Sequence, residues 1–344
     1  MPKELTHCLF ADRALAAYEA APGADSAFAA LLRRRRVPLH MGAVMVDTYF
    51  YALHAPPFER PFPTFGDMIH GAGGEDTARL PLAMLEAARM TVDRDLREER
   101  LAFAAGFLTH VALDSVMHPF VYNVTGNYYA LDPRARDGAM TRHRLLEAWL
   151  DLHVLGEAGL DPRTNTLFEA IRRAPSGPRL RTFYAAATDL VFGQSSPAAW
   201  ALARGWAVQS FANRIFPIRP IVRALAWLNR RLGRRLDPYL SLCYDWKDGS
   251  IPREILDFAA FRHPITGETR EGGIARLLGE AGARARDYLS AAGAFAASGD
   301  IAAFRQVVVG LSLDFGIPGS KSADATHFDL IPDARLWPPG EAAD

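Results

Sequence analysis

The side chains best suited to chemistry lie in one stretch of the chain, where histidines and carboxylates recur four residues apart: His110, Asp114, His118, His143 and Glu147. The first three stand at i, i+4 and i+8 in an apolar run from 101 to 121, so on a helix they share one face. The last two repeat the i, i+4 spacing on a second amphipathic segment. Imidazole and carboxylate ligands without thiolate suit zinc, manganese or iron. The stretch therefore predicts a metal site.

The spacing also predicts more than one ion. A helix rises about 1.5 Å per residue, which places His110 and His118 roughly 12 Å apart along the axis. This is too far for one ion with bonds of about 2 Å, and Asp114 lies between the two histidines. Pro119 disfavours helical dihedrals at the residue before it, so we expect the helix to end or bend at His118. Clustered ions bridged by a carboxylate suit the hydrolysis of phosphoesters.

A structural interpretation competes with this one. A single histidine on an apolar face is more often a hydrogen-bonded core residue than a ligand, so His110 alone would not indicate a metal. However, eight of the ten histidines precede residue 154, and carboxylates accompany them. Asp47 lies in a helical stretch, and His70 lies in a glycine-bounded loop over 66–74. Asp151 extends the second histidine face by one turn, where it either orients a ligand histidine or is an ordinary salt-bridged residue.

The elements that must position these residues are helices. Apolar residues recur with helical periodicity over these ranges: 5–20, 26–36, 40–53, 78–90, 94–118, 166–173, 178–192, 197–214, 273–297 and 301–313. A further helix that begins at Thr141 would carry the second pair of candidate ligands, and no hairpin pattern is evident. The sequence therefore predicts an all-α fold in one compact body. We expect a metal-binding helical core at 1–195 and a helical extension at 196–344 packed on it.

Composition narrows the class of protein. A hydrophobic content of 49% and a charged content of 23% are those of an ordinary globular protein. The formal net charge is zero, which gives no global attraction to nucleic acid. Charged residues interrupt the first thirty-six positions where a signal peptide needs an apolar region, and no eighteen-residue apolar run occurs, so we expect a cytoplasmic location. Two distant cysteines predict neither a disulfide framework nor a zinc–thiolate site.

One segment departs from this charge balance. Residues 190–236 contain eight arginines and no acidic residue. Apolar residues in its last part are spaced as one helical stripe: Ile221, Leu225, Leu228, Leu232 and Leu236. A basic amphipathic helix over 220–236 would suit peripheral contact with an anionic membrane, with Trp227 near the interface. A helix that packs its stripe on the core is the simpler interpretation, because any surface helix is amphipathic.

Several short motifs, taken in order, resemble the zinc-dependent phospholipase C family. They are Leu5-Thr6-His7, Gly42-Ala43-Val44-Met45-Val46-Asp47, Gly66-Asp67-Met68-Ile69-His70, His110-x-x-x-Asp114-x-x-x-His118-Pro119 and His143-x-x-x-Glu147. The resemblance covers about the first 150 residues and implies a compact multi-helix bundle around a metal cluster, a fold that the family shares with single-strand nucleases. It also implies two or three zinc ions.

The resemblance assigns the ligands as follows. Asp47, His70, His110 and Asp114 would hold one ion, with Asp114 bridging to a neighbouring ion. A second ion would be held by three residues: His118, His143 and Glu147. His7 would serve a third ion.

The expected activity is zinc-dependent hydrolysis of a phosphodiester, with a phospholipid as the favoured substrate. Asp114 would bridge ions, and Asp47 would act as a ligand or general base. A single-strand nuclease or small-molecule phosphodiesterase would use the same centre, although zero net charge disfavours nucleic acid. A non-catalytic protein in which metals only cross-link helices is the third alternative. Structural zinc sites are usually closed and rich in cysteine, which argues against it.

Overall fold

The computed structural model describes residues 3–52, 64–193, 198–244, 251 and 253–330. Helices account for most of them, which confirms the all-α prediction. The longer helices are α1 (Glu4–Glu19), α2 (Ser26–Arg34), α3 (Arg36–Met45), α5 (Arg79–Arg89), α6 (Arg94–Thr125), α7 (Pro133–Glu157), α9 (Gly177–Phe192), α10 (Ala198–Ile215), α11 (Arg219–Arg231) and α14 (Ile274–Ser298). The shorter ones are η1 (Val46–Tyr51), α4 (Phe65–Ile69), α8 (Leu167–Arg173), α12 (Asp237–Leu240), α13 (Arg253–Leu256), α15 (Ile301–Val307) and η2 (Ser322–Asp324).

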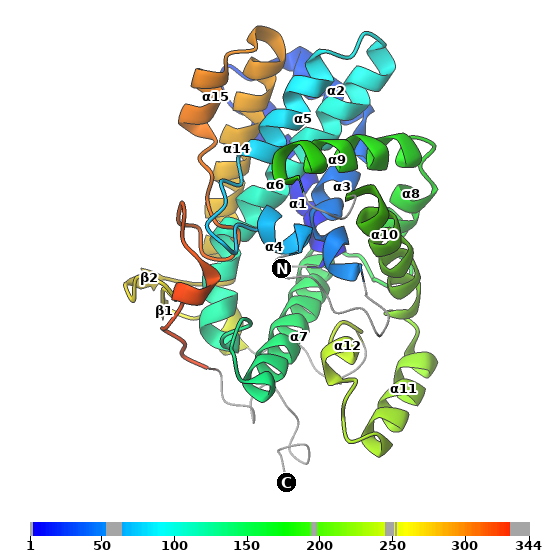
Figure 1. Cartoon of the computed structure of the whole chain (residues 1–344), viewed down its shortest axis with the longest axis vertical. Helices are drawn as coiled ribbons and strands as arrows, with labels where there is room; N and C mark the ends of the chain where they lie inside the picture. Colours follow the sequence, from blue (N-terminus) through cyan, green and yellow to red (C-terminus); the bar gives the residue numbers. More distant parts are fainter. Residues whose placement is uncertain (1–2, 53–63, 194–197, 245–250, 252, 331–344) are drawn as a thin grey trace.

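Helix α6 lies at the centre of the fold, where α3, α5 and α14 pack against it (Figure 1). Asp93 caps its start by accepting a hydrogen bond from the Leu96 backbone N–H, as Asp at an N-cap should. Although polar residues such as His110 and Asp114 interrupt it, α6 is long and apolar enough on average to cross a membrane by length and composition, which the expectation of no eighteen-residue apolar run missed. Its most apolar 18-residue window is wholly buried inside the protein. This is the character of a central core helix.

Two glycines let α3 and α6 approach until their backbones touch. A Cβ added at Gly42 would lie 1.9 Å from the Phe103 carbonyl oxygen, and one at Gly106 would lie 1.9 Å from that of Leu39. No larger residue fits at either position. Because η1 follows α3 directly, this close contact fixes Asp47 relative to the histidines of α6.

The predicted end of the helix at His118 is wrong, because α6 continues through Pro119 to Thr125. A proline inside a helix costs about 3 kcal/mol through its missing N–H and its clash with the preceding turn. Burial offsets this cost here, since every residue from 101 to 125 is buried. As a result His118 stays on the same helical face as Asp114 and is not turned away from it.

Several other expectations need correction. The helix predicted over 301–313 ends at Val307, so Leu313 lies outside it. Helix α7 begins at Pro133 under an Asp132 cap, earlier than the predicted start at Thr141. Part of the predicted loop at 66–74 is helix α4, which a Thr64–Asp67 capping box begins. The structure also contains a hairpin of β1 (Ala260–Arg262) and β2 (Thr269–Glu271), antiparallel with Phe261 opposite Arg270. Strands of three residues are too short to show an alternating pattern.

Helices from both sides of residue 195 share one hydrophobic core. Leu277, Ala281, Ala285 and Leu289 of α14 are buried in the same apolar cluster as Leu108 of α6. We therefore propose that the predicted core at 1–195 and the predicted extension at 196–344 fold as one unit.

Candidate metal centre

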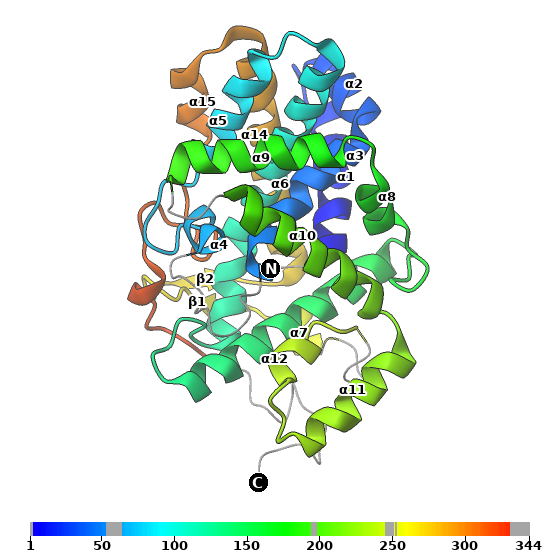
Figure 2. The ribbon, with the colours of Figure 1, turned by 45° about the vertical axis from the view of Figure 1, so that its right-hand side comes forward.

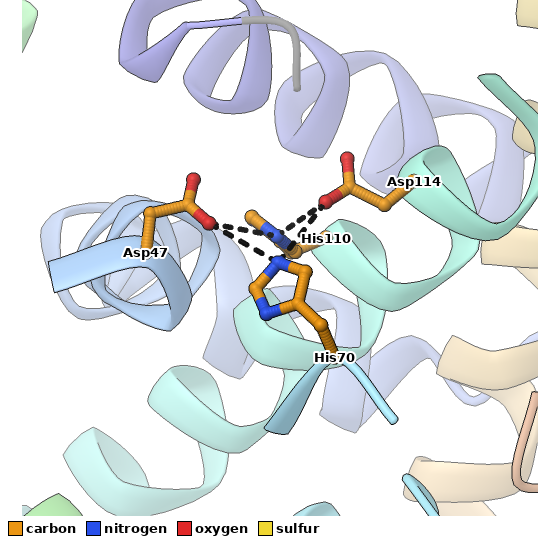
Figure 3. Close-up of side chains that lie close together, drawn as sticks. All are labelled: Asp47, His70, His110 and Asp114. Carbon is orange, nitrogen blue, oxygen red and sulfur yellow. Dashed lines mark ion pairs between the residues drawn. The ribbon is translucent and has the colours of Figure 1, made fainter. Parts of the chain in front are cut away.

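The first group of candidate ligands comes from three separate segments. Asp47 lies in η1, and His70 is the residue directly after α4. His110 and Asp114 lie one turn apart on α6. Figure 3 shows the four side chains pointing at one another. One ligand atom from each lies within 4.8 Å of those of the others. The closest contacts are 2.8 Å from His110 Nε2 to Asp114 Oδ2 and 3.3 Å from His70 Nε2 to Asp47 Oδ1.

The second group joins α6 to α7. His118, His143 and Glu147 have ligand atoms within 4.8 Å of one another, and His143 Nε2 lies 2.8 Å from Glu147 Oε1. Asp114 stands between the two groups, because its Oδ2 is 4.0 Å from His118 Nε2 and 3.8 Å from His70 Nε2. One carboxylate therefore faces both groups. The two groups contain the residues that the resemblance assigns to the first and second ions.

His7 belongs to neither group but lies beside the first. Its Nε2 is 3.5 Å from Asp114 Oδ1, and its ring stacks on His110 at 3.9 Å between centroids. It is completely enclosed by the protein. The second oxygen of Asp114 thus faces the residue that the resemblance assigns to a third ion.

Asp151 has a different role from the one predicted. It accepts hydrogen bonds from the backbone N–H and the hydroxyl of Thr6 and, at 2.8 Å, from the Tyr244 hydroxyl. Burial raises the pKa of Asp151 to about 6. The contact with Thr6 fixes the start of α1, so Asp151 positions His7 through the backbone and not through a bond to its imidazole.

Backbone carbonyls fix the tautomer of three histidines. The Nδ1 atoms of His70, His110 and His118 lie 2.9, 2.7 and 2.9 Å from the carbonyl oxygens of Gly66, Ala43 and Leu313. A carbonyl oxygen only accepts, so each Nδ1 carries the proton and donates it. Each ring therefore presents its Nε2 atom to the centre of the cluster, where this nitrogen can bind a cation when it carries no proton. This is how most metal-binding histidines are held.

Burial and neighbouring charges set the protonation of the cluster. Burial holds the pKa of His7 and His118 well below the usual range, so both rings are neutral and can offer a nitrogen lone pair to a cation. Burial opposes ionisation of Asp114, but the surrounding imidazoles hold its pKa well below the usual range. For His70 the effect of burial is exceeded by a hydrogen bond to Asp47, which raises the pKa of His70 to about 9.

The donor atoms fit divalent cations. Among the described residues, neither oxygen of Asp114 has a hydrogen-bond partner, and the same holds for the Nε2 atoms of His7, His110 and His118. Lone pairs of imidazole and carboxylate that face one another at these distances repel unless a proton or a cation lies between them. Nitrogen and carboxylate oxygen in groups of three or four are an ordinary zinc ligand set.

The C-terminal segment supplies contacts that the sequence did not indicate. The Leu313 carbonyl orients His118, and the Leu313 N–H donates to the His70 carbonyl at 2.9 Å, so one residue contacts both groups. Asp314 is buried, and its Oδ1 lies 3.8 Å from His118 Nδ1. Its Oδ2 accepts from the hydroxyls of Tyr129 and Ser322. A buried acidic residue in a non-periodic segment gives no local signal of such a position.

A cavity of about 240 Å³ opens onto both groups. Asp47, His70, His118, His143 and Glu147 line it, whereas Asp114 lies beneath them. Aromatic residues form much of the remaining wall: Phe50, Tyr51, Tyr122, Tyr128, Tyr129, Phe216 and Tyr239. The centre is therefore accessible to a small molecule, unlike a closed structural metal site.

The described part of the protein is an all-α body built around two adjacent groups of imidazole and carboxylate side chains, without thiolate. This fold and this site define a class of helical proteins with clustered candidate metal ligands. Comparison with known families gives a more specific assignment. The family model for zinc-dependent phospholipase C matches residues 6–184, more than half of the chain, and the chain therefore belongs to that family. The matched range contains all eight candidate ligands. No curated protein and no solved structure matches the chain.

Proposed function

We propose that this protein is a phosphodiester hydrolase of phospholipase C type that uses two or three zinc ions. The observation that carries the proposal is the convergence of seven candidate ligand residues in two adjacent groups, five of which line one cavity. Asp47, His70, His110 and Asp114 would hold one ion, and His118, His143 and Glu147 another. His7 would contribute to a third site next to Asp114.

Zinc bound there would neutralise the phosphate and lower the pKa of a water molecule towards neutrality. The residues around the zinc would have different roles. Asp47 faces the cavity, where its carboxylate can accept a proton from water. Asp114 is wholly buried beneath the cavity, so it would act through its negative charge as the shared ligand. The carbonyls behind His70, His110 and His118 hold the imidazoles still.

A phospholipid is the substrate class that we favour. The cavity wall is mainly apolar and aromatic, which suits a molecule that carries apolar chains beside its phosphodiester group. A single-strand nuclease or a small-molecule phosphodiesterase would use the same centre. The family membership favours phospholipase chemistry, and zero net charge does not favour nucleic acid. The open cavity argues against a metal that only cross-links helices. We keep the cytoplasmic location as a proposal.

Substrate competition tests this proposal. We expect the zinc-loaded protein to hydrolyse a short-chain phospholipid and a soluble chromogenic phosphodiester, with a higher kcat/KM for the lipid because the apolar wall binds its chains. A chelator should remove both activities, and added zinc should restore them. Single-stranded DNA serves as the competing substrate. Faster cleavage of DNA would support the nuclease alternative, and hydrolysis of none of the three would refute the proposal.

A further inference from the structure

Helix α10 presents aromatic side chains on its solvent face. Its inner face is buried through Leu202, Trp206 and Gln209. Its outer face, offset by two residues from the inner one, exposes Trp200 to 49% and Phe211 to 65%. An amphipathic surface helix normally places polar residues there. The exposed aromatic residues are therefore not explained by packing of the helix on the core.

Helix α11 departs from the core-packed interpretation in the same way. Only Val222 and Asn229 are buried on it, while Ile221 and Leu228 are exposed and Trp227 is 51% exposed. The helix ends at Arg231, followed by Gly233 at φ 68°, so the predicted stripe does not continue as a helix to Leu236. What remains is a short helix that packs Val222, Leu225 and Ala226 on the core and exposes Ile221, Trp227 and Leu228.

The charge on these helices has one sign. Residues 190–236 carry eight arginines without an acidic residue, although the whole chain has a net charge of zero. The guanidinium of Arg231 lies 4.4 Å from the Trp227 ring centroid, and that of Arg204 lies 5.4 Å from the Trp200 ring centroid. Aromatic side chains paired with arginines combine an apolar contact with attraction to anions.

Residues of α10 and α12 also form part of the cavity wall. Val208, Ala212 and Phe216, on or just after the inner side of α10, line the cavity, as does Tyr239 of α12, which is also 54% exposed. A Cβ added at Gly205 would lie 2.1 Å from the Thr48 carbonyl, so α10 sits directly on η1, next to Asp47. Figure 2 shows α10 above α11, with α12 beside α11 and nearer the middle of the view.

We propose that the outer faces of α10 and α11, with Tyr239, form a docking surface for an anionic lipid bilayer beside the mouth of the cavity. The exposed residues that define this docking surface are Trp200, Phe211, Ile221, Trp227, Leu228 and Tyr239. A bilayer suits both of its properties, because aromatic side chains enter the headgroup region and arginines are attracted to anionic lipids. The inference rests on the proposed lipid substrate, since docking here would bring that substrate to the cavity.

Vesicle binding by the full-length zinc-loaded protein tests the proposal. We expect binding to vesicles of phosphatidylcholine with 30% phosphatidylglycerol, decreasing with salt, and much weaker binding to pure phosphatidylcholine. The triple variant Arg223→Glu, Arg230→Glu and Arg231→Glu should lower binding to anionic vesicles roughly 100-fold. The double variant Phe211→Ser and Trp227→Ser should also weaken it. Both variants should hydrolyse a soluble chromogenic phosphodiester at the wild-type rate, because they leave the centre intact.

A matched control carries the same charge change elsewhere. Arg79→Glu, Arg97→Glu and Arg276→Glu reverse three exposed arginines on α5, α6 and α14 and should leave vesicle binding unchanged. Absence of wild-type binding to anionic vesicles, or equal loss in both triple variants, would overturn the proposal. The proposal would also be overturned if the triple variant of Arg223, Arg230 and Arg231 lost binding to single-stranded DNA but kept its binding to anionic vesicles. Vesicle binding by a protein that hydrolyses no phosphodiester would refute the proposed function while supporting the docking surface.

Discussion

Replacing Asp114 with asparagine is expected to abolish phosphodiesterase activity and to lower the zinc content. The carboxylate is fully buried, and its oxygens lie within 4.0 Å of imidazole nitrogens of four histidines: His7, His70, His110 and His118. Asparagine keeps the shape but removes the negative charge that offsets the repulsion between two cations. We expect activity to fall by a factor on the order of 1,000 or more, which corresponds to about 4 kcal/mol of transition-state stabilisation.

The Glu99→Gln variant is the matched control for this experiment. Glu99 is also a buried carboxylate of α6, but it lies 2.6 Å from Arg179 Nη2 instead of facing the histidine cluster. Glutamine keeps the shape and an acceptor for the arginine, so zinc content should stay near that of the wild type. Elemental analysis and the rate on a soluble phosphodiester are measured for both variants. Full activity and unchanged zinc in Asp114→Asn would show that Asp114 is an ordinary helix residue.

Removal of the metal should lower the thermal stability of the protein markedly. Without cations, the lone pairs of Asp114, His110 and His118 face one another in a buried space without hydrogen bonds. A ligand present at a thousand times its Kd stabilises the folded state by about 4 kcal/mol, which predicts a fall in Tm on the order of 10 °C when zinc is stripped. Scanning calorimetry before and after treatment with a chelator measures this. Added zinc should restore the original Tm, and an unchanged Tm would contradict the proposed ligands.

The same experiment has an expected pH dependence. In the metal-free protein the pKa of His70 is raised to about 9, so this ring carries a proton at neutral pH that zinc must displace. The affinity for zinc should therefore fall as the pH decreases below about 9. The stability of the metal-free protein should change with pH in the opposite direction to the affinity for zinc. The raised pKa stabilises the folded state at low pH, and this contribution is lost as the pH rises through 9.

The sequence predicted the parts of the centre that lie close together along the chain. The i, i+4 spacing of His110 and Asp114, and of His143 and Glu147, places each pair on one helix face, and the structure has both. The grouping of Asp47 and His70 with α6 could not follow from spacing, because three segments far apart in sequence supply these residues. It came from the resemblance to a known family.

Other features depended on tertiary contacts that no local pattern encodes. Pro119 is tolerated because the helix around it is buried, so the local tendency to end the helix is overridden. Leu313 reaches the centre through backbone atoms, which any residue could supply. The exposure of Phe211 is also invisible in sequence, since an apolar residue on an amphipathic helix is expected to face the core. For Trp227 the sequence left both orientations open.

Each of the two groups of candidate ligands is expected to bind a cation. The direct measurement is the metal content of the full chain, purified without chelator and analysed by mass spectrometry of the elements against the protein concentration. We expect at least two zinc ions per chain, because the ligand atoms of His118, His143 and Glu147 form a group separate from that of Asp47, His70, His110 and Asp114. A value of one ion or none would contradict the claim.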